Sequence, residues 1–166
     1  MESTSRLELA SLHRQGRISE GGGSVTERFS TDFVVDDNRL SALVNRDVAS
    51  CLGWGDRAWQ DQVVNKLLLR GEPDFLPNRY ALYVCPECGD LGCGALSAVI
   101  ERDGECVVWR DFGWANNYEE MVDRSGFEHL GPFRFDFSAY EQLLLSSSSS
   151  SAPRDHIDES RASHPR

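Results

Sequence analysis

The stretch ALSAVIERDGECVVWRDF, residues 95–112, decides the fold of this chain. Two runs rich in β-branched and aromatic residues flank Asp103-Gly104, a dipeptide typical of a two-residue type I′ hairpin turn. Such a turn places Glu101 opposite Cys106 on the neighbouring strand. Because both faces of the hairpin carry apolar residues, we expect it at the centre of a sheet that is covered on both sides.

Shorter patterns on either side of the hairpin complete the predicted fold. Three runs have the composition of strands: residues 29–35, 79–85 and 133–136. Helical patterns follow Asp36 or Asp37, Asp56 and Asp136, where an aspartate is well placed to cap a helix. The sequence therefore predicts an α+β domain, with a mostly antiparallel sheet of about four or five strands and helices packed on it.

The two ends of the chain are polar. The first 28 residues include the run Gly21-Gly22-Gly23-Ser24, and residues 146–151 are all serine. Such segments bury too little apolar area to offset the entropy of ordering. We therefore expect a disordered leader over residues 1–28, a single domain over 29–145 and a serine-rich disordered tail over 146–166.

The charge balance limits the possible partners. The chain of 166 residues has a formal net charge of −10, from 27 acidic and 17 basic residues. This argues against nucleic acid and anionic membranes, which bind clustered lysine and arginine, and it suits a basic protein partner. No segment resembles a signal peptide or a membrane span. With five cysteines and no export signal, we expect a cytoplasmic protein whose cysteines are thiols or metal ligands.

The segment YVCPECGDLGCG, residues 83–94, is the clearest candidate site, because it holds Cys85, Cys88 and Cys93. The Cys-Pro-x-Cys-Gly pattern is typical of a zinc knuckle, in which two thiolates face one ion and backbone N–H groups freed by glycine bond to sulfur. Cys93 would be a third zinc ligand. A dithiol formed by Cys85 and Cys88, or a tight glycine-rich turn with small buried cysteines, would explain the same segment.

Structural zinc needs a fourth ligand, and the segment does not supply an obvious one. In the predicted hairpin Cys106 lies about 26 Å from Cys93, which excludes it. Cys51 and His129 remain as candidates, together with a nearby carboxylate, Asp90 or Glu87.

A second candidate surface follows the hairpin. Aromatic and amide side chains gather at one strand end, where rigid rings can anchor a partner: Trp109, Asp111, Trp114, Asn116, Asn117 and Tyr118. The same pattern fits packed aromatics and an asparagine turn. The predicted register places this strand end beside Cys93.

Three motifs together resemble a family of small uncharacterised proteins from actinobacteria and related bacteria: CPECGDLGCGA, VVWRDFGWANNY and GPFRFDFSAYEQLL. The similarity covers about residues 33–145. The resemblance implies a bacterial cytosolic protein, and it brings no activity, substrate or catalytic residue with it.

No Ser-His-Asp set, dinucleotide fingerprint or phosphate loop occurs in the sequence. Our leading hypothesis is therefore a non-enzymatic binding domain with a structural zinc at Cys85, Cys88 and Cys93. One form of it is an inhibitor whose acidic surface covers a basic toxin or nuclease. The alternative is a thiol-dependent oxidoreductase that uses Cys85 and Cys88.

Overall fold

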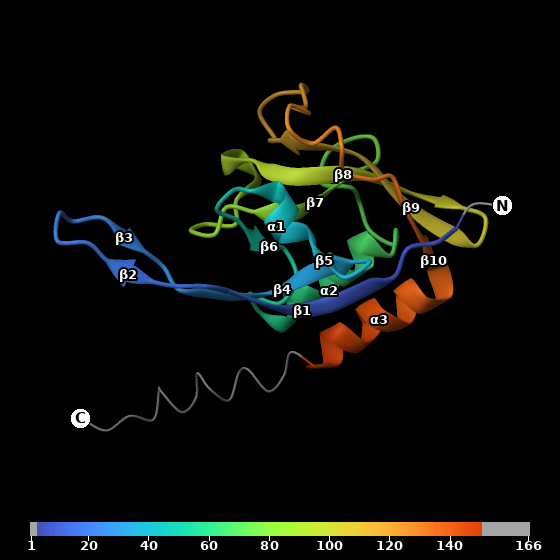
Figure 1. The fold of residues 1–166 in the computed structure, drawn as a ribbon, viewed down its shortest axis with the longest axis horizontal. Coiled ribbons are helices and arrows are strands. Elements are labelled where there is room, and N and C mark those ends of the chain that lie inside the picture. Colours follow the sequence, from blue (N-terminus) through green and yellow to red (C-terminus); the bar gives the residue numbers. More distant parts are fainter. Residues whose placement is uncertain (1–2, 151–166) are drawn as a thin grey trace.

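The structure, a computed structural model, describes residues 3–150, and for residues 148–150 it describes only the backbone (Figure 1). Strands dominate this part of the chain. The elements follow in the order β1 (Leu7–Arg14), β2 (Arg17–Ile18), β3 (Ser24–Val25), β4 (Arg28–Val35), β5 (Asn38–Arg39), α1 (Leu40–Val44), β6 (Ala49–Ser50), α2 (Arg57–Leu67), β7 (Arg79–Val84), a short 3-10 turn (Leu91–Cys93), β8 (Ala95–Asp103), β9 (Cys106–Ala115), β10 (Phe133–Asp136) and α3 (Phe137–Ser150).

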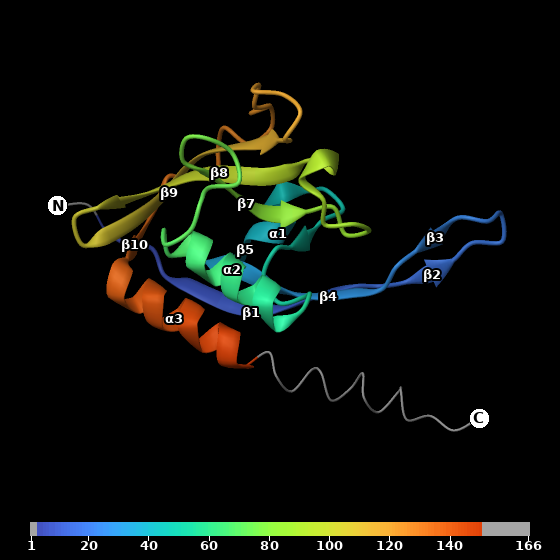
Figure 2. The same ribbon diagram turned by 180° about the vertical axis from the view of Figure 1, so that it is seen from behind.

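Two antiparallel sheets form the body of the molecule. The larger has five strands in the order β10-β9-β8-β7-β6, and the smaller has three in the order β1-β4-β5. Strands β2 and β3 form an arm that projects away from the body (Figures 1 and 2). The α+β class and the mostly antiparallel sheet are confirmed. Within residues 3–150, no helix combines the length and the apolar character needed to cross a membrane.

The β8–β9 hairpin is central in its sheet, as predicted, but its register was predicted wrongly. Cys106 pairs with Asp103 and not with Glu101. The reason is the turn, which is centred on Gly104 and Glu105. Gly104 has φ 64° and Glu105 has no positive φ, which suits a type II′ turn, where only the first central residue needs a left-handed backbone.

The prediction of a disordered leader was wrong for residues 7–28. Strand β1 pairs with β4 along its whole length, from Leu7 opposite Val35 to Arg14 opposite Arg28. The segment has too few apolar residues to fold alone, and β4 supplies both its hydrogen-bond partners and a core to cover. At the other end, residues 146–150 continue α3 in place of the predicted tail. The rest of that predicted tail lies outside the described residues.

Two of the three predicted helix caps are confirmed. Asp56 and Asp136 accept backbone N–H groups at the starts of α2 and α3, at 2.8 and 3.0 Å. Asp36 and Asp37 do not cap α1. They have positive φ angles of 49° and 72° and turn the chain from β4 into β5, so the helix begins only at Leu40.

The core is centred on Trp109 of β9, which is completely buried. Its ring meets those of Phe33, Phe135 and Tyr140 edge-on, at centroid distances of 5.3, 5.2 and 6.1 Å. The indole N–H donates to the Tyr140 hydroxyl at 3.1 Å, and that hydroxyl donates to the Leu67 carbonyl at 2.6 Å. One aromatic cluster therefore joins both sheets to α2 and α3.

A buried carboxylate also links the two sheets. Asp32 of β4 is completely buried and accepts hydrogen bonds from the hydroxyls of Tyr83, at 2.5 Å, and Ser41, at 2.6 Å. Arg39 Nη1 lies 3.1 Å from the same carboxylate. Burial, and then the charge of Asp32, raise the pKa of Tyr83 well above its ordinary value, so its hydroxyl stays a donor.

Replacing Tyr83 with Phe will remove one donor from buried Asp32 without creating a large cavity. We expect the free energy of unfolding, measured by urea denaturation, to fall by about 1–3 kcal/mol. Tyr118→Phe is the matched control because Tyr118 is 80% exposed, and it should change the free energy by less than about 0.5 kcal/mol. Equal effects of the two variants would show that the buried contact is not stabilising.

Candidate metal centre

The three clustered cysteines lie in the loop that joins β7 to β8. A tight turn follows β7, in which the Gly89 N–H donates to the Cys85 carbonyl at 2.8 Å. The Asp90 side chain then caps the 3-10 turn by accepting the Gly92 N–H at 2.9 Å. Gly94 has φ 96°, and a Cβ there would overlap the Trp114 indole, so the loop needs glycine at this point.

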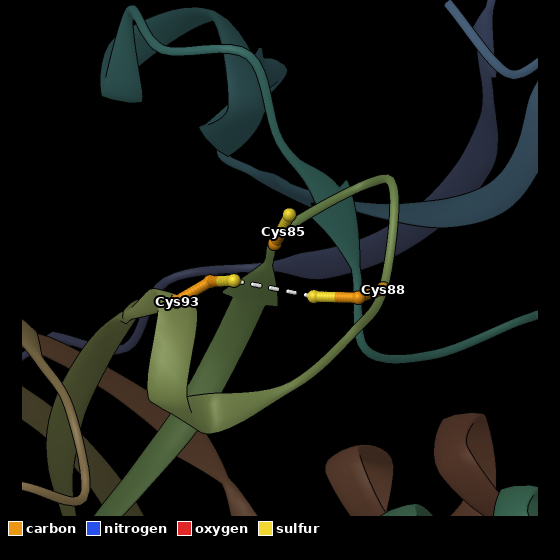
Figure 3. Close-up of side chains that lie close together, drawn as sticks. All are labelled: Cys85, Cys88 and Cys93. Atoms are coloured by element: carbon orange, nitrogen blue, oxygen red, sulfur yellow. Dashed lines mark hydrogen bonds between the residues drawn. The ribbon is translucent and has the colours of Figure 1, made fainter.

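This loop brings the three thiols together (Figure 3). The Sγ atoms of Cys85, Cys88 and Cys93 all lie within 4.8 Å of one another, and those of Cys88 and Cys93 are 3.3 Å apart. The Asp90 N–H donates to Cys88 Sγ at 3.4 Å. Cys88 and Cys93 are exposed and Cys85 is half-buried, so the interpretation as small buried side chains is wrong. The three thiols are close enough to bind one metal ion.

The surroundings shift the pKa values of Cys85 and Cys93 in opposite directions. Burial raises the pKa of Cys85, but the backbone N–H groups of Cys88 and Glu87 and the two neighbouring thiols outweigh it, and the net shift is downward. Hydrogen bonding to Cys88, with the charges of Cys85 and Cys88, raises the pKa of Cys93 to about 11. Because the thiolate is the form that binds metal, the lowered pKa of Cys85 favours metal binding.

None of the predicted fourth ligands joins this cluster within residues 3–150. Cys51 is buried, and its Sγ lies 3.4 Å from the Ala81 carbonyl. His129 is exposed in the segment between β9 and β10. The Asp90 carboxylate accepts a hydrogen bond from the Gly92 N–H, and the Glu87 carboxylate accepts hydrogen bonds from Arg14 and Thr26. The cluster is thus a three-thiol set that is open to solvent.

Glu87 attaches the cysteine loop to the base of the projecting arm. Its carboxylate accepts from Arg14 Nη1 at 2.7 Å, and from the hydroxyl and N–H of Thr26 at 2.7 and 3.1 Å. Hydrogen bonds from the Thr26 hydroxyl, Arg14 and the Thr26 N–H lower the pKa of Glu87 to about 2. Arg28 adds a bond from Nε to the Pro86 carbonyl at 3.0 Å, and its guanidinium lies 4.2 Å from the Trp54 ring centroid.

The sequence prediction missed these contacts because Arg14 and Thr26 were assigned to a disordered leader. The signal that could have revealed β1 is the alternation of Leu7 and Leu9, which fits a strand better than a helix.

Part of the predicted aromatic surface lies beside the cysteine loop. Tyr118 is 80% exposed, and a Cβ added at Gly92 would lie 3.0 Å from its hydroxyl. Asn116 is half-buried, and its side chain accepts the N–H of Tyr118 at 2.8 Å, which makes it a turn residue; Asn117 beside it is exposed. Trp109 does not belong to this surface, because it is in the core.

Two further members of the predicted surface have structural partners. The Arg46 guanidinium lies 4.6 Å from the ring centroid of half-buried Trp114. The Asp111 carboxylate lies between two arginines, 2.6 Å from Arg79 Nη2 and 2.6 Å from Arg124 Nε. The hydrogen bond from Arg124 outweighs burial and, with the charge of Arg79, lowers the pKa of Asp111. Tyr118 and Asn117 are therefore the members most accessible to a partner.

Comparisons of the chain with protein-family models, curated proteins and solved structures found no match. The resemblance to an actinobacterial family therefore stays a prediction.

The contacts of Glu87 predict that the cysteine loop stabilises the arm against local opening. Replacing Glu87 with Ala removes the acceptor of the Thr26 N–H, so we expect faster amide hydrogen exchange at Thr26 and in residues 15–27. Glu119→Ala is a suitable control, since Glu119 is exposed and its side chain has no hydrogen bond to another described residue. Unchanged exchange in the arm of Glu87→Ala would contradict this role.

Proposed function

We propose that this chain is a zinc-binding interaction domain in which Cys85, Cys88 and Cys93 hold a structural ion. The observation that carries the proposal is the grouping of their Sγ atoms within 4.8 Å. Thiolates select zinc over harder cations such as magnesium and calcium. The N–H group of Asp90 that points to Cys88 Sγ supplies the kind of outer hydrogen bond that orients a metal-bound sulfur.

The fourth coordination position faces solvent in this proposal. Cys88 and Cys93 are exposed, and none of the predicted fourth ligands lies with them. A water molecule or a side chain from a partner would complete the tetrahedron. The ion would be structural because it closes the loop whose Glu87 holds the base of the arm.

The proposed interaction surface lies next to this position. Tyr118 and Met121 are 80% and 74% exposed, and Glu119 and Glu120 lie between them in the sequence. An aromatic anchor beside acidic side chains suits a basic protein partner, as does the net charge of −10. The proposal places the protein in the cytoplasm, where thiols stay reduced and available to metal.

A second candidate function is thiol redox chemistry, which the contact of 3.3 Å between Cys88 Sγ and Cys93 Sγ favours. This is a different pair from the predicted Cys85 and Cys88. Hydrogen peroxide would take two electrons and two protons from the two thiols, so that one disulfide forms and two water molecules leave. Such an enzyme needs thiols that are accessible and free of metal.

Elemental analysis of protein purified without chelators tests the zinc site. We expect about one zinc per chain in the wild type and less than about 0.2 after replacement of Cys85, Cys88 or Cys93 by Ser, because each variant leaves only two thiolates. Cys106→Ser is the matched control, since Cys106 is a free cysteine at the hairpin turn, and it should retain the metal.

The contrary result is also informative. Wild-type protein without metal, with thiols that react rapidly with iodoacetamide and a Cys88–Cys93 disulfide in peptide maps, would support the redox function in place of zinc. Metal-free protein with slow alkylation of all three thiols would eliminate both functions.

The interaction surface can be tested with an immobilised chain at low salt. We expect the immobilised chain to retain basic proteins. The amount retained should fall at least about tenfold when Tyr118 and Met121 are both replaced by Ser, because buried aromatic anchors dominate such interfaces. Ile18→Ser is the control, since Ile18 is 88% exposed on the arm. Equal retention by both variants would refute this surface.

A further inference from the structure

A cleft of about 190 Å³ lies between α2 and β7. Apolar side chains form its walls: Trp59, Val63 and Leu67 from α2, and Ala81 and Val84 from β7. Its lining includes the buried thiol of Cys51. The cleft is therefore a site from which water is easily displaced by apolar atoms.

The cysteine loop contributes one end of the cleft. Gly89 and Leu91 line it there, beyond Val84 at the end of β7. Gly89 has φ 68° and lies against Trp54, so that a Cβ added to it would come 2.9 Å from the ring. This end has no charged side chain among the lining residues.

The other end, where α2 finishes and β7 begins, carries the polar groups. Lys66 Nζ donates to Asp74 Oδ1 at 2.7 Å, and Asp74 Oδ2 accepts the Ala81 N–H at 2.9 Å. Each oxygen of Asp74 thus accepts one hydrogen bond, and the ammonium of Lys66, which has three N–H donors, keeps donors to spare. A ligand atom at this end would have to be an acceptor to bind Lys66.

Tyr80 supplies a second, unused polar group at the same end. The residue is only 6% exposed, but its hydroxyl oxygen is not among the fully buried atoms that lack a hydrogen-bond partner within residues 3–150. The hydroxyl therefore keeps access to solvent, where a water molecule or a ligand atom can pair with it. Burial, then the charges of Asp74 and Glu72, raise the pKa of Tyr80, so the hydroxyl keeps its proton and can donate.

We infer that this cleft binds an uncharged small molecule made of one ring and a short arm that ends in a carbonyl or hydroxyl oxygen. The ring lies between the apolar walls of α2 and β7, and the oxygen accepts from Tyr80 and Lys66. An apolar cavity of about 150 Å³ holds a benzene ring, so the 190 Å³ of this cleft leaves room for the arm.

The charges at the polar end select against ions. An anion next to Lys66 would also approach Asp74 and Glu72, and a cation would meet the ammonium of Lys66. Since Lys66 and Asp74 already neutralise one another in their ion pair, a neutral oxygen acceptor fits this end best.

Three compounds of matched shape test the inference: benzamide, benzoate and toluene. We expect benzamide to cause saturable NMR shifts of residues that line the cleft, with a dissociation constant of about 1 mM or tighter. Benzoate and toluene should bind at least about fivefold more weakly, because one carries a charge and the other lacks the acceptor.

Two variants locate the binding. Val63→Phe fills the space between the walls and should abolish the shifts. Tyr80→Phe keeps the ring and removes the donor, so it should weaken benzamide by about fivefold and leave toluene unchanged. Ile18→Ser, on the exposed arm, should affect neither compound. If Val63→Phe fails to fold, Tyr80→Phe still tests whether benzamide binds in the cleft.

Absence of saturable shifts up to about 20 mM benzamide would overturn the inference, because a fitting ligand of this size binds well below that concentration. Stronger binding of benzoate, or equal binding by Tyr80→Phe, would overturn the assigned polar end. The measurements use both zinc-treated and chelator-treated protein. Binding in both states would support the cleft whether or not the proposed metal site exists.

Discussion

The burial of Trp109 is the constraint on which the rest of the structure depends. An indole inside a core needs an acceptor for its N–H group, and here the acceptor is the hydroxyl of Tyr140. That hydroxyl in turn donates a hydrogen bond to the Leu67 carbonyl at the end of α2. The two hydrogen bonds fix α2 and α3 against the larger sheet, and the edge contact with Phe33 fixes the smaller sheet against it. The positions of α2 and β7, and hence of the cleft between them, follow from this arrangement.

The loop of residues 85–94 is where the functional features meet. Its glycines allow large side chains to approach its backbone closely, with Trp54 against Gly89, Tyr118 against Gly92 and Trp114 against Gly94. Its three cysteines lie close enough to bind one metal ion, its Glu87 holds the arm, and its Leu91 lines the cleft. A small domain can place several binding features together in this way because a loop between two central strands is held at both ends.

The candidate site was predictable as a group of residues but not as a geometry. Spacing alone brought Cys85, Cys88 and Cys93 into one short loop. Which thiols lie in contact depends on the 3-10 turn of residues 91–93, which turns Cys93 toward Cys88. Whether Cys51 or His129 lies near the three thiols was not predictable, because packing between elements that are distant in the sequence sets their positions relative to the loop.

The sequence by itself determined the α+β class, the central hairpin, two aspartate-capped helices and the clustering of three cysteines. These features depend on local periodicity, turn residues and short spacing, which neighbouring residues specify. Tertiary structure alone decided that residues 7–14 pair with β4, that Trp109 belongs to the core, and that Glu87 joins the loop to the arm. Each of these depends on pairing between segments that are far apart in the chain, and the free energy of such pairing comes from burial and hydrogen bonds that exist only in the folded molecule.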